Sequence, residues 1–538
     1  MRTLIVGIDG ATFDLVRPWA AAGHLPNLAR LMEEGAHGPL ASTLPPVTSP
    51  AWPSFMTGCN PGKHGVFDFI QAKGNDFSLV NSSQIRQPTL WQRLSAAGYR
   101  AGVLNVPVTY PPQPINGFMV TGILSPTGGQ ICYPADLIGR YQAELGDYRY
   151  APRVQYKPGN EAEFIADLYD LVRAQAEWAL KLMAAEPWDV LMVHFISLDI
   201  LMHALWRFMD RSHPRHEPGP FEHALREGYQ LVDDYLGRLM EQAAADHVFV
   251  MSDHGFGPLH KIVNLNIFLM QAGFLKLRGD LLTRLRAGAF RRGLTPAGVY
   301  HLLERLGLQN LAARASKETR NQIVAKLLSF DSVDWRRTRA YSLGHVGQIY
   351  LNLAGREAQG VVRPEEYDGT LKALIEALGE LRDEAGRPLV SQIISRAEAH
   401  HGPFAADGPD LHLVLDDYKM IAFPLFATNG EVVTEQIRGD SGCHRREGVF
   451  IAWGAEVGAG LALAEADITD VAPTLLHLLG RPVPAVMDGR VIESIFKRRR
   501  EVAFEEEGQD DGYRPAGEAL SVEETAQIEA RLRSLGYL

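Results

Sequence analysis

The sequence contains very little cysteine. Its 538 residues include only three, Cys59, Cys132 and Cys443, which lie far apart and form no CxxC pair. An odd number of distant cysteines does not build a disulfide framework. The missing CxxC spacing also argues against a cysteine-rich zinc module. The chain therefore belongs to neither class.

Long hydrophobic runs are missing as well. No segment approaches the length of a membrane span. Residues 1–9 are apolar over too few positions for a signal peptide and are interrupted by Asp9. We therefore expect a cytoplasmic protein without a membrane span.

The chain has no excess of positive charge. Its net charge is −11, with 22% charged and 46% hydrophobic residues, which is an ordinary composition for a globular protein. This balance argues against a protein that coats nucleic acid. It is compatible with a small anionic substrate, because bound cations can reverse the local field.

Strand-like and helix-like segments alternate along most of the chain, which predicts an α/β sandwich of three layers with a central, mostly parallel sheet. In such folds the sites lie at the carboxyl ends of the strands. The expected core strands are residues 4–8, 101–106, 118–121, 188–196, 247–252 and 449–453. The expected helices include residues 15–34, with breaks at Pro18 and Pro26, and residues 89–97, 160–185 and 222–245.

The length of the chain predicts insertions or a second domain. The region 275–335 is rich in Arg, Leu and Ala and predicts an inserted helical cap, whose arginines face either solvent or an anionic substrate.

A final helix is predicted over residues 522–535. We expect it to pack on the core of its own chain or, alternatively, to form a docking or homodimer contact. The predicted division is core 1–274, helical cap 275–335, small α/β lobe 336–440, core 441–496, and linker with C-terminal helix 497–538.

Two hydroxyl side chains, Thr48 and Ser49, stand immediately before Pro50 at the start of a predicted amphipathic helix. Ser or Thr is a favoured N-cap and Pro a favoured first helical residue. The positive end of such a helix binds phosphate readily. Taken alone, the stretch is better explained as an ordinary capped helix.

Aspartate and histidine side chains recur at or near predicted strand ends. Asp199 and His203 are four residues apart, so both lie on one face of a helical turn. Asp253 and His254 directly follow an apolar strand. A turn at Asp9 or a chance DxxxH spacing would explain single cases, but six such ligands fit two zinc-type sites. The six candidates are Asp9, Asp199, His203, Asp253, His254 and His444.

The ordered set of motifs resembles the alkaline phosphatase superfamily, and within it the type I phosphodiesterase/nucleotide pyrophosphatase family. The resemblance covers about residues 3–496 without the helical insert. The matching motifs are Gly7-Ile-Asp-Gly10, Thr48-Ser-Pro50, Thr57-Gly58, Asn60-Pro-Gly-Lys-His-Gly65, Asp199 with His203, Ser252-Asp-His-Gly255, and His444.

This resemblance implies roles for the candidate residues. It implies two divalent ions per chain, zinc or alternatively manganese. It also selects Thr48 over Ser49 as the nucleophile, a choice that the residues alone leave open. In the implied assignment Asp199, His203 and His444 hold one metal, and Asp9, Asp253 and His254 hold the other together with Thr48.

The chain departs from the family pattern directly after Pro50. The nucleotide pyrophosphatase branch typically has there an Asn that binds the phosphoryl oxygen, whereas this chain has Ala51. Trp52 follows, and it either lines the substrate pocket or belongs to the core. Sulfatases need a Cys or Ser at the position of Thr48 and an Arg shortly after Pro50. Neither is present, so sulfatase activity is not expected.

We therefore predict a two-metal phosphohydrolase that cleaves phosphodiester or nucleotide pyrophosphate bonds through a phosphothreonine on Thr48. Its partner would be a small phosphorylated substrate, with a nucleotide as one option. A phosphotransferase or phosphomutase on the same core is an alternative. A non-catalytic binding protein is a second alternative, although all six candidate ligands and the hydroxyl are present.

Overall fold

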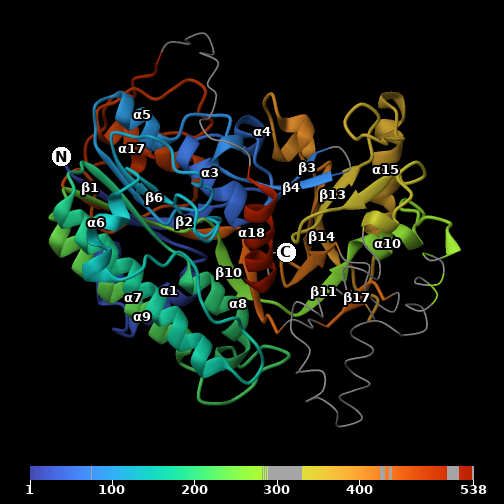
Figure 1. Ribbon diagram of the computed structural model, residues 1–538, viewed down its shortest axis with the longest axis horizontal. Helices are drawn as coiled ribbons and strands as arrows, with labels where there is room; N and C mark the ends of the chain where they lie inside the picture. Colours follow the sequence, from blue (N-terminus) through green and yellow to red (C-terminus); the bar gives the residue numbers. More distant parts are fainter. Residues whose placement is uncertain are drawn as a thin grey trace.

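The computed structural model describes residues 1–73, 76–281, 283, 285, 288, 330–383, 385–424, 431–435, 439–505 and 520–535. A large α/β body lies beside a smaller lobe (Figure 1). Most of the predicted helical cap, 275–335, and residues 506–519 of the predicted linker lie outside the described residues. Among the described helices, none is both long and apolar enough to cross a membrane.

The body is organised around a ten-stranded sheet in the order β20-β2-β19-β9-β1-β8-β5-β6-β7, with β21 also paired to β2. Five neighbouring strands run parallel: β9 (His247–Met251), β1 (Thr3–Ile8), β8 (Val190–Phe195), β5 (Ala101–Leu104) and β6 (Gly117–Val120). The remaining strands are β2 (Ala36–Ala41), β7 (Cys132–Tyr133), β19 (Glu447–Gly454), β20 (Leu461–Ala462) and β21 (Ala466–Asp467).

Helices cover both faces of this sheet, which confirms the predicted three-layer sandwich (Figure 1). One layer contains α1 (Phe13–Ala21), α2 (Pro26–Glu34), α7 (Glu161–Ala185), α8 (Ser197–Met209) and α9 (Ala224–Ala243). The other contains α3 (Thr48–Thr57), α5 (Leu90–Ala96) and α17 (Val471–Leu478). Smaller elements of the body are α4 (Pro61–His64), α6 (Leu137–Leu145), β10 (Gly255–Pro258) and β18 (Gly442–Arg445).

The two predicted proline breaks have different outcomes. Pro26 is the first residue of α2. A backbone N–H at this position would have no intrahelical partner, so its absence in proline costs no hydrogen bond. Pro18 lies inside α1, so the predicted break there is wrong.

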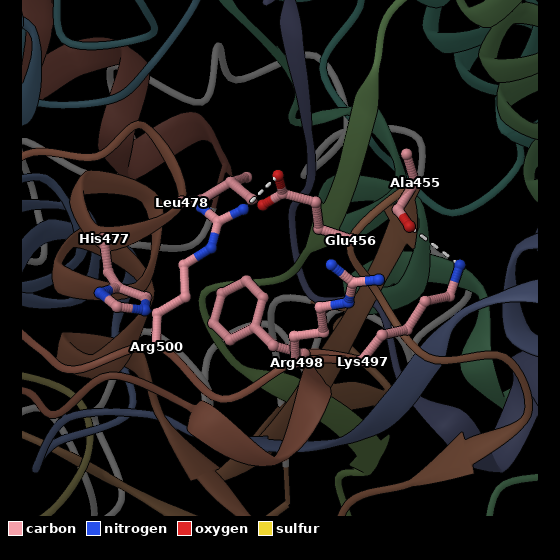
Figure 2. A pocket seen from close by; sticks show the side chains of 8 residues that line it. Ala455, Glu456, His477, Leu478, Lys497, Arg498 and Arg500 are labelled. Carbon is pink, nitrogen blue, oxygen red and sulfur yellow. Dashed lines mark hydrogen bonds and ion pairs between the residues drawn. The ribbon is translucent and has the colours of Figure 1, made fainter.

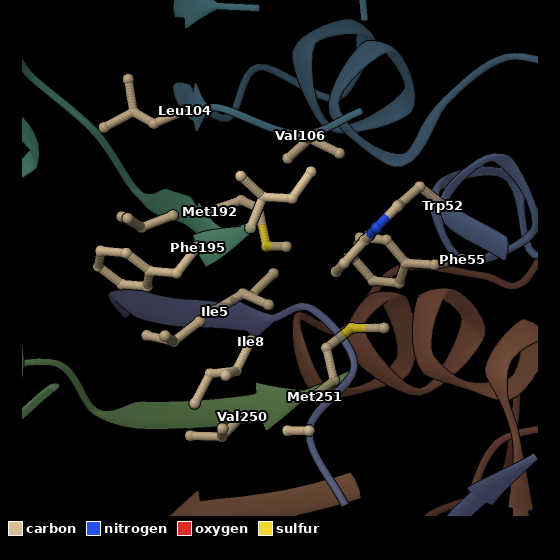
Figure 3. Packing of buried hydrophobic residues seen from close by; sticks show 14 of the residues in the cluster. Ile5, Ile8, Trp52, Phe55, Leu104, Val106, Met192, Phe195, Val250 and Met251 are labelled. Carbon is tan, nitrogen blue, oxygen red and sulfur yellow. The ribbon is translucent and has the colours of Figure 1, made fainter. Parts of the chain in front are cut away.

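The central strands form because their residues are apolar and buried on both faces, as in other parallel sheets. All six residues of β1 and all six of β8 are buried. Figure 3 shows Trp52 and Phe55 of α3 pointing toward strand side chains such as Met192 and Met251. Burial of each large apolar side chain contributes about 1.5–3 kcal/mol.

Gly7 in β1 lets α3 approach the sheet closely. A Cβ at this position would lie 2.7 Å from a ring carbon of Trp52 and 2.9 Å from Cε of Met192. A larger residue would push α3 away from the strand. This close contact fixes the helix that carries Thr48.

The small lobe has its own hydrophobic core. Its four-stranded antiparallel sheet has the order β12 (Ala340–Ser342), β13 (Gln348–Leu351), β15 (Leu411–Leu415) and β14 (Val390–Ser395). A second sheet contains β16 (Met420–Phe423), β11 (Lys261–Asn264) and β17 (Val433–Thr434), and the helices are α10 (Leu265–Gln271), α15 (Tyr367–Gly379) and α16 (Arg396–Ala399). A separate hairpin, β3 (Ile70–Lys73) and β4 (Asp76–Leu79), belongs to the N-terminal half of the chain.

The lobe also uses residues that precede the predicted boundary at 274. Val263, Leu265 and Leu269 pack in its core. The chain therefore enters the lobe directly after β10, before the predicted helical cap.

The C-terminal helix α18 (Val522–Leu535) packs on the body of the same chain. Ile528 and Leu532 are fully buried. The Tyr110 hydroxyl donates to Glu524 at 2.6 Å, and Arg531 Nη1 donates to the Ile123 carbonyl at 2.9 Å. Of the alternatives for this helix, the described contacts match packing on its own core.

Candidate active site

The candidate residues gather at the carboxyl ends of neighbouring parallel strands. Asp9 directly follows β1, Asp199 lies in the first turn of α8 after β8, and Asp253 follows β9. His444 comes from β18, where it pairs with Phe256 of β10. Because β9, β1 and β8 are adjacent, these chain segments meet at one edge of the sheet.

Three candidates form a first group: Asp199, His203 and His444, with potential ligand atoms all within 4.8 Å of one another. Asp199 Oδ1 lies 3.6 Å from Nε2 of His203 and 3.3 Å from Nε2 of His444. The two Nε2 atoms are 2.9 Å apart. The four-residue spacing on α8 thus places both ligands on one helix face, as predicted.

The hydrogen bonds of the two imidazoles explain why this group fits a cation. Nδ1 of His203 lies 3.0 Å from the Gly442 carbonyl, and Nδ1 of His444 lies 2.9 Å from the Pro46 carbonyl. A carbonyl only accepts, so Nδ1 of each ring carries a hydrogen and a neutral ring presents a lone pair at Nε2. Burial lowers the pKa of His203, which favours its neutral form. Two facing lone pairs at this distance fit a metal ion.

The second group contains Asp9, Asp253 and His254, all fully buried, again with potential ligand atoms within 4.8 Å. Nε2 of His254 lies 3.3 Å from Asp253 Oδ2 and 3.6 Å from Asp9 Oδ1. Nδ1 of His254 is 3.1 Å from the Gly255 carbonyl, so its Nε2 is also free to act as a ligand. Among the described residues, Asp9 Oδ1 and Asp253 Oδ2 have no hydrogen-bond partner. Buried carboxylate oxygens of this kind fit a divalent cation.

The pKa shifts of the buried carboxyl groups also fit a site for cations. Burial, together with the charges of Asp253 and Asp199, raises the pKa of Asp9 well above its usual range. Burial and the charge of Asp199 raise the pKa of Asp253 to about 7. Burial opposes ionisation of Asp199 as well, but the facing imidazoles hold its pKa below the usual range. Bound cations would relieve the repulsion among these carboxylates.

Thr48 lies beside the second group, with Oγ1 3.3 Å from Nε2 of His254. It is the first residue of α3, and Val47, in extended conformation, occupies the N-cap position without a side-chain cap. The predicted capping role of Thr48 and Ser49 and the predicted first position of Pro50 are therefore wrong. All ten residues of α3 are buried, so the helix is not amphipathic either.

The hydroxyl of Thr48 is available for chemistry because Val47, and not Thr48, occupies the N-cap position of α3. It does not cap the helix and faces His254 instead. Ser49 Oγ is also buried and has no hydrogen-bond partner among the described residues. Both hydroxyls thus lie at the positive end of a buried helix.

Trp52 and Ala51 are completely buried. The indole N–H of Trp52 donates to Asp9 Oδ2 at 3.3 Å, and its ring packs edge-on against His194. Trp52 therefore lies in the core behind Asp9, which favours the core interpretation over a place in the substrate pocket. Ala51, expected at a substrate contact, offers only a methyl group in this buried helix.

The sequence interpretation missed His194, which also holds Asp9. Its Nε2 lies 2.9 Å from Asp9 Oδ2, while its Nδ1 lies 3.1 Å from the Asn105 carbonyl. Burial lowers the pKa of His194 to about 3. The available signal was a single histidine inside an otherwise apolar parallel strand. His194 and Trp52 together engage Oδ2 and leave Oδ1 of Asp9 on the side of His254.

The three-layer fold and the paired Asp/His groups beside a helix-starting threonine define a member of the alkaline phosphatase superfamily. The model of the type I phosphodiesterase/nucleotide pyrophosphatase family matches residues 3–417, and the chain belongs to this family. The predicted family is thereby confirmed. The class of enzyme that it defines is a phosphodiester- or pyrophosphate-cleaving hydrolase.

Solved structures of similar fold come from ectonucleotide pyrophosphatase/phosphodiesterase 5. The murine protein matches with a TM-score of 0.50 and 12% identity, over 92% of this chain and 100% of that chain. The human protein matches with a TM-score of 0.49 and 13% identity, over 93% of this chain and 100% of that chain. The comparison with curated proteins gives no match.

Proposed function

We propose that this chain is a two-metal phosphohydrolase acting on phosphodiester or nucleotide pyrophosphate bonds, with Thr48 as the nucleophile. The observation that carries the proposal is the position of Thr48 Oγ1, 3.3 Å from His254 Nε2 at the start of α3. A hydroxyl next to a buried Asp/His group is the arrangement needed to activate a weak nucleophile. The family description, which names nucleotide pyrophosphatases, supports a nucleotide substrate.

In this proposal Asp199, His203 and His444 hold one divalent ion, and Asp9, Asp253 and His254 hold the second. The mixed Asp/His ligands favour zinc, with manganese as the alternative. When bound, two such ions supply a lowered pKa for the nucleophile and charge stabilisation for the leaving oxygen. His194 and Trp52 orient Asp9 toward its site.

The residues of the chain then perform the following steps. Thr48 Oγ1 attacks phosphorus, and the bond between phosphorus and the leaving oxygen breaks, which gives a phosphothreonine and the free alcohol or phosphate. Water then hydrolyses the phosphothreonine and restores the hydroxyl. The N-terminal backbone N–H groups of α3 face the developing negative charge, as helix N-termini do in phosphate sites.

The choice of substrate provides the test. We expect bis-p-nitrophenyl phosphate and a dinucleotide with a pyrophosphate bond to be hydrolysed faster than p-nitrophenyl phosphate by the zinc-loaded chain. A preference for the monoester would contradict the diesterase assignment. The same assay with added sugar or alcohol acceptors separates hydrolysis from transfer, since a transferase would phosphorylate the acceptor in preference to water.

A further inference from the structure

A cavity of about 300 Å³ lies at the opposite end of the central sheet from the candidate active site. Strand β19 connects the two places. It starts three residues after His444, and its last residue, Gly454, pairs with His247 at the beginning of β9. Eight strand residues at about 3.3 Å each place the cavity about 25 Å from the candidate active site.

Three of the eight residues that line this cavity are cationic. Lys497, Arg498 and Arg500 face it, against one carboxylate, that of Glu456. Figure 2 shows Lys497 and Arg498 on one side of the cavity and Arg500 on the other, where it reaches Glu456. This concentration of positive charge occurs in a chain whose net charge is −11.

Backbone hydrogen bonds hold the basic segment on both sides. The Lys497 N–H donates to the Glu456 carbonyl at 2.9 Å, and the Gly458 N–H donates to the Ile495 carbonyl at 2.8 Å. Further along, the Val483 N–H donates to the Ala503 carbonyl at 2.8 Å. The five residues between Lys497 and Ala503 are therefore held at both ends, next to the end of β19 on one side and at Val483 on the other, so little ordering is needed when a ligand binds.

The three cations differ in the partners they already have. Lys497 Nζ donates to the Ala455 carbonyl at 2.9 Å, and Arg500 pairs with Glu456 at 2.6 Å. In the part of the chain that the structure describes, Arg498 has no ion pair or side-chain hydrogen bond, although it lines the cavity. Its guanidinium thus offers five donors in the fork geometry that suits phosphate.

Apolar and aromatic groups form another part of the wall. The rings of Phe496 and His477 meet edge-to-face with centroids 5.4 Å apart, and Leu478 lies beside them in the lining. A flat ring can pack on such a surface while its charged end reaches the cations. Exposed arginines are usually only solvated, but here they converge on a concave site of ligand size.

We propose that this cavity binds a small phosphate-bearing ligand with a flat ring, of the nucleoside phosphate class. Arg498 and Arg500 would bind the phosphate group, and Phe496 with His477 would contact the ring. The concave shape and the ring-lined wall favour a small molecule over a nucleic acid or a membrane surface. The proposal rests on this cavity alone and does not depend on the mechanism at Thr48.

The test compares AMP binding by two variants of the full chain in equilibrium dialysis. Arg498→Ala/Arg500→Ala removes the two guanidinium groups from the cavity. Arg499→Ala is the matched control, because Arg499 is the intervening arginine, lies outside the lining and pairs with Glu493 at 2.7 Å. Binding at the candidate active site is common to both variants, so their difference reports the cavity.

We expect Arg499→Ala to retain the AMP binding of the unaltered chain and the double variant to lose one class of site, with Kd raised at least about tenfold. Inorganic phosphate should show the same difference more weakly, and adenosine should show none. Hydrolysis of bis-p-nitrophenyl phosphate should stay within about twofold in both variants, which shows that each is folded. Equal AMP binding by the two variants, or an equal difference with adenosine, would overturn the proposal.

Discussion

The Nε2 atoms of His203 and His444 lie 2.9 Å apart, while the Nδ1 atom of each ring faces a backbone carbonyl. In its neutral form, each ring therefore directs a lone pair toward the same space, next to the carboxylate of Asp199. Such an arrangement is unfavourable without a positive charge between the rings. The facing Nε2 atoms of His203 and His444 therefore make the group with Asp199 a specific, testable candidate metal site.

The first prediction concerns metal content. We expect two zinc ions per chain after dialysis against zinc, and one in His444→Ala, since Asp9, Asp253 and His254 remain. Plasma mass spectrometry measures both. His401→Ala is the control, because His401 is 65% exposed and pairs with Asp488 outside both groups. A His444→Ala variant that keeps two ions would refute the assignment of the first group.

The second prediction concerns His194 as a positioning residue. We expect His194→Gln to weaken zinc affinity at the second group and hydrolysis by about 10- to 100-fold, since the partner of Asp9 Oδ2 is altered. The affinity of the first group should change little. Competition with a coloured chelator measures the two affinities separately.

A matched control for His194→Gln is His64→Gln. His64 is equally buried and lies 2.9 Å from the Ser54 hydroxyl, and burial likewise lowers its pKa to about 3. Its loss should reduce stability without a selective effect on the second group. Equal losses of zinc affinity in both variants would show that His194 acts only through folding.

The third prediction concerns pH and the junction between body and lobe. Asp68 of the body is buried, with 4% of its surface exposed, and accepts a hydrogen bond from Gln348 of the lobe at 2.7 Å. Burial raises its pKa from 3.8 to about 6. The folded chain therefore binds this proton more tightly than the unfolded chain. The resulting stability is present below about pH 4 and is lost as the pH rises to about 6.

The substitution Asp68→Asn removes this dependence, so the difference from the unaltered chain isolates it. Between pH 4 and pH 7 the unaltered chain should lose on the order of 3 kcal/mol of unfolding free energy relative to Asp68→Asn. Urea unfolding at the two pH values measures the change. A pH-independent difference would show that Asp68 ionises normally in the folded chain.

The alternating strands and helices predicted that most of the ligands meet, because the carboxyl ends of neighbouring parallel strands share one sheet edge. Their division into two metal sites came from the family resemblance. Asp9, Asp199 and Asp253 follow three such strands, and the four-residue spacing added His203. His444 was the weakest candidate from the residues alone, since a lone histidine far along the chain carries no such signal, and the family resemblance supplied its role. In the structure, the pairing of β18 with β10 brings His444 to the other candidate ligands.

The features that escaped prediction depend on tertiary contacts. The start of α3 is set by the extended conformation of Val47 and by burial of the whole helix, so capping preferences chose the wrong residue. The role of His194 depends on the pairing of β8 with β1. This pairing places His194 opposite Gly7, and Gly7 lies two residues before Asp9 in the chain. Trp52 was a candidate pocket residue because it follows Ala51 after Pro50, and the choice between pocket and core stayed open because its indole partner, Asp9, is 43 positions away in the chain.

The fourth prediction, and the most direct test of the proposed function, is the activity of Thr48→Ala with its metal content measured in the same sample. Hydrolysis of bis-p-nitrophenyl phosphate should fall by at least about 1000-fold. Ser49→Ala, which removes the adjacent and equally buried hydroxyl, should lose far less. Two zinc ions per chain should remain bound in both variants. Near-normal turnover by zinc-loaded Thr48→Ala would contradict the assignment of Thr48 as the nucleophile.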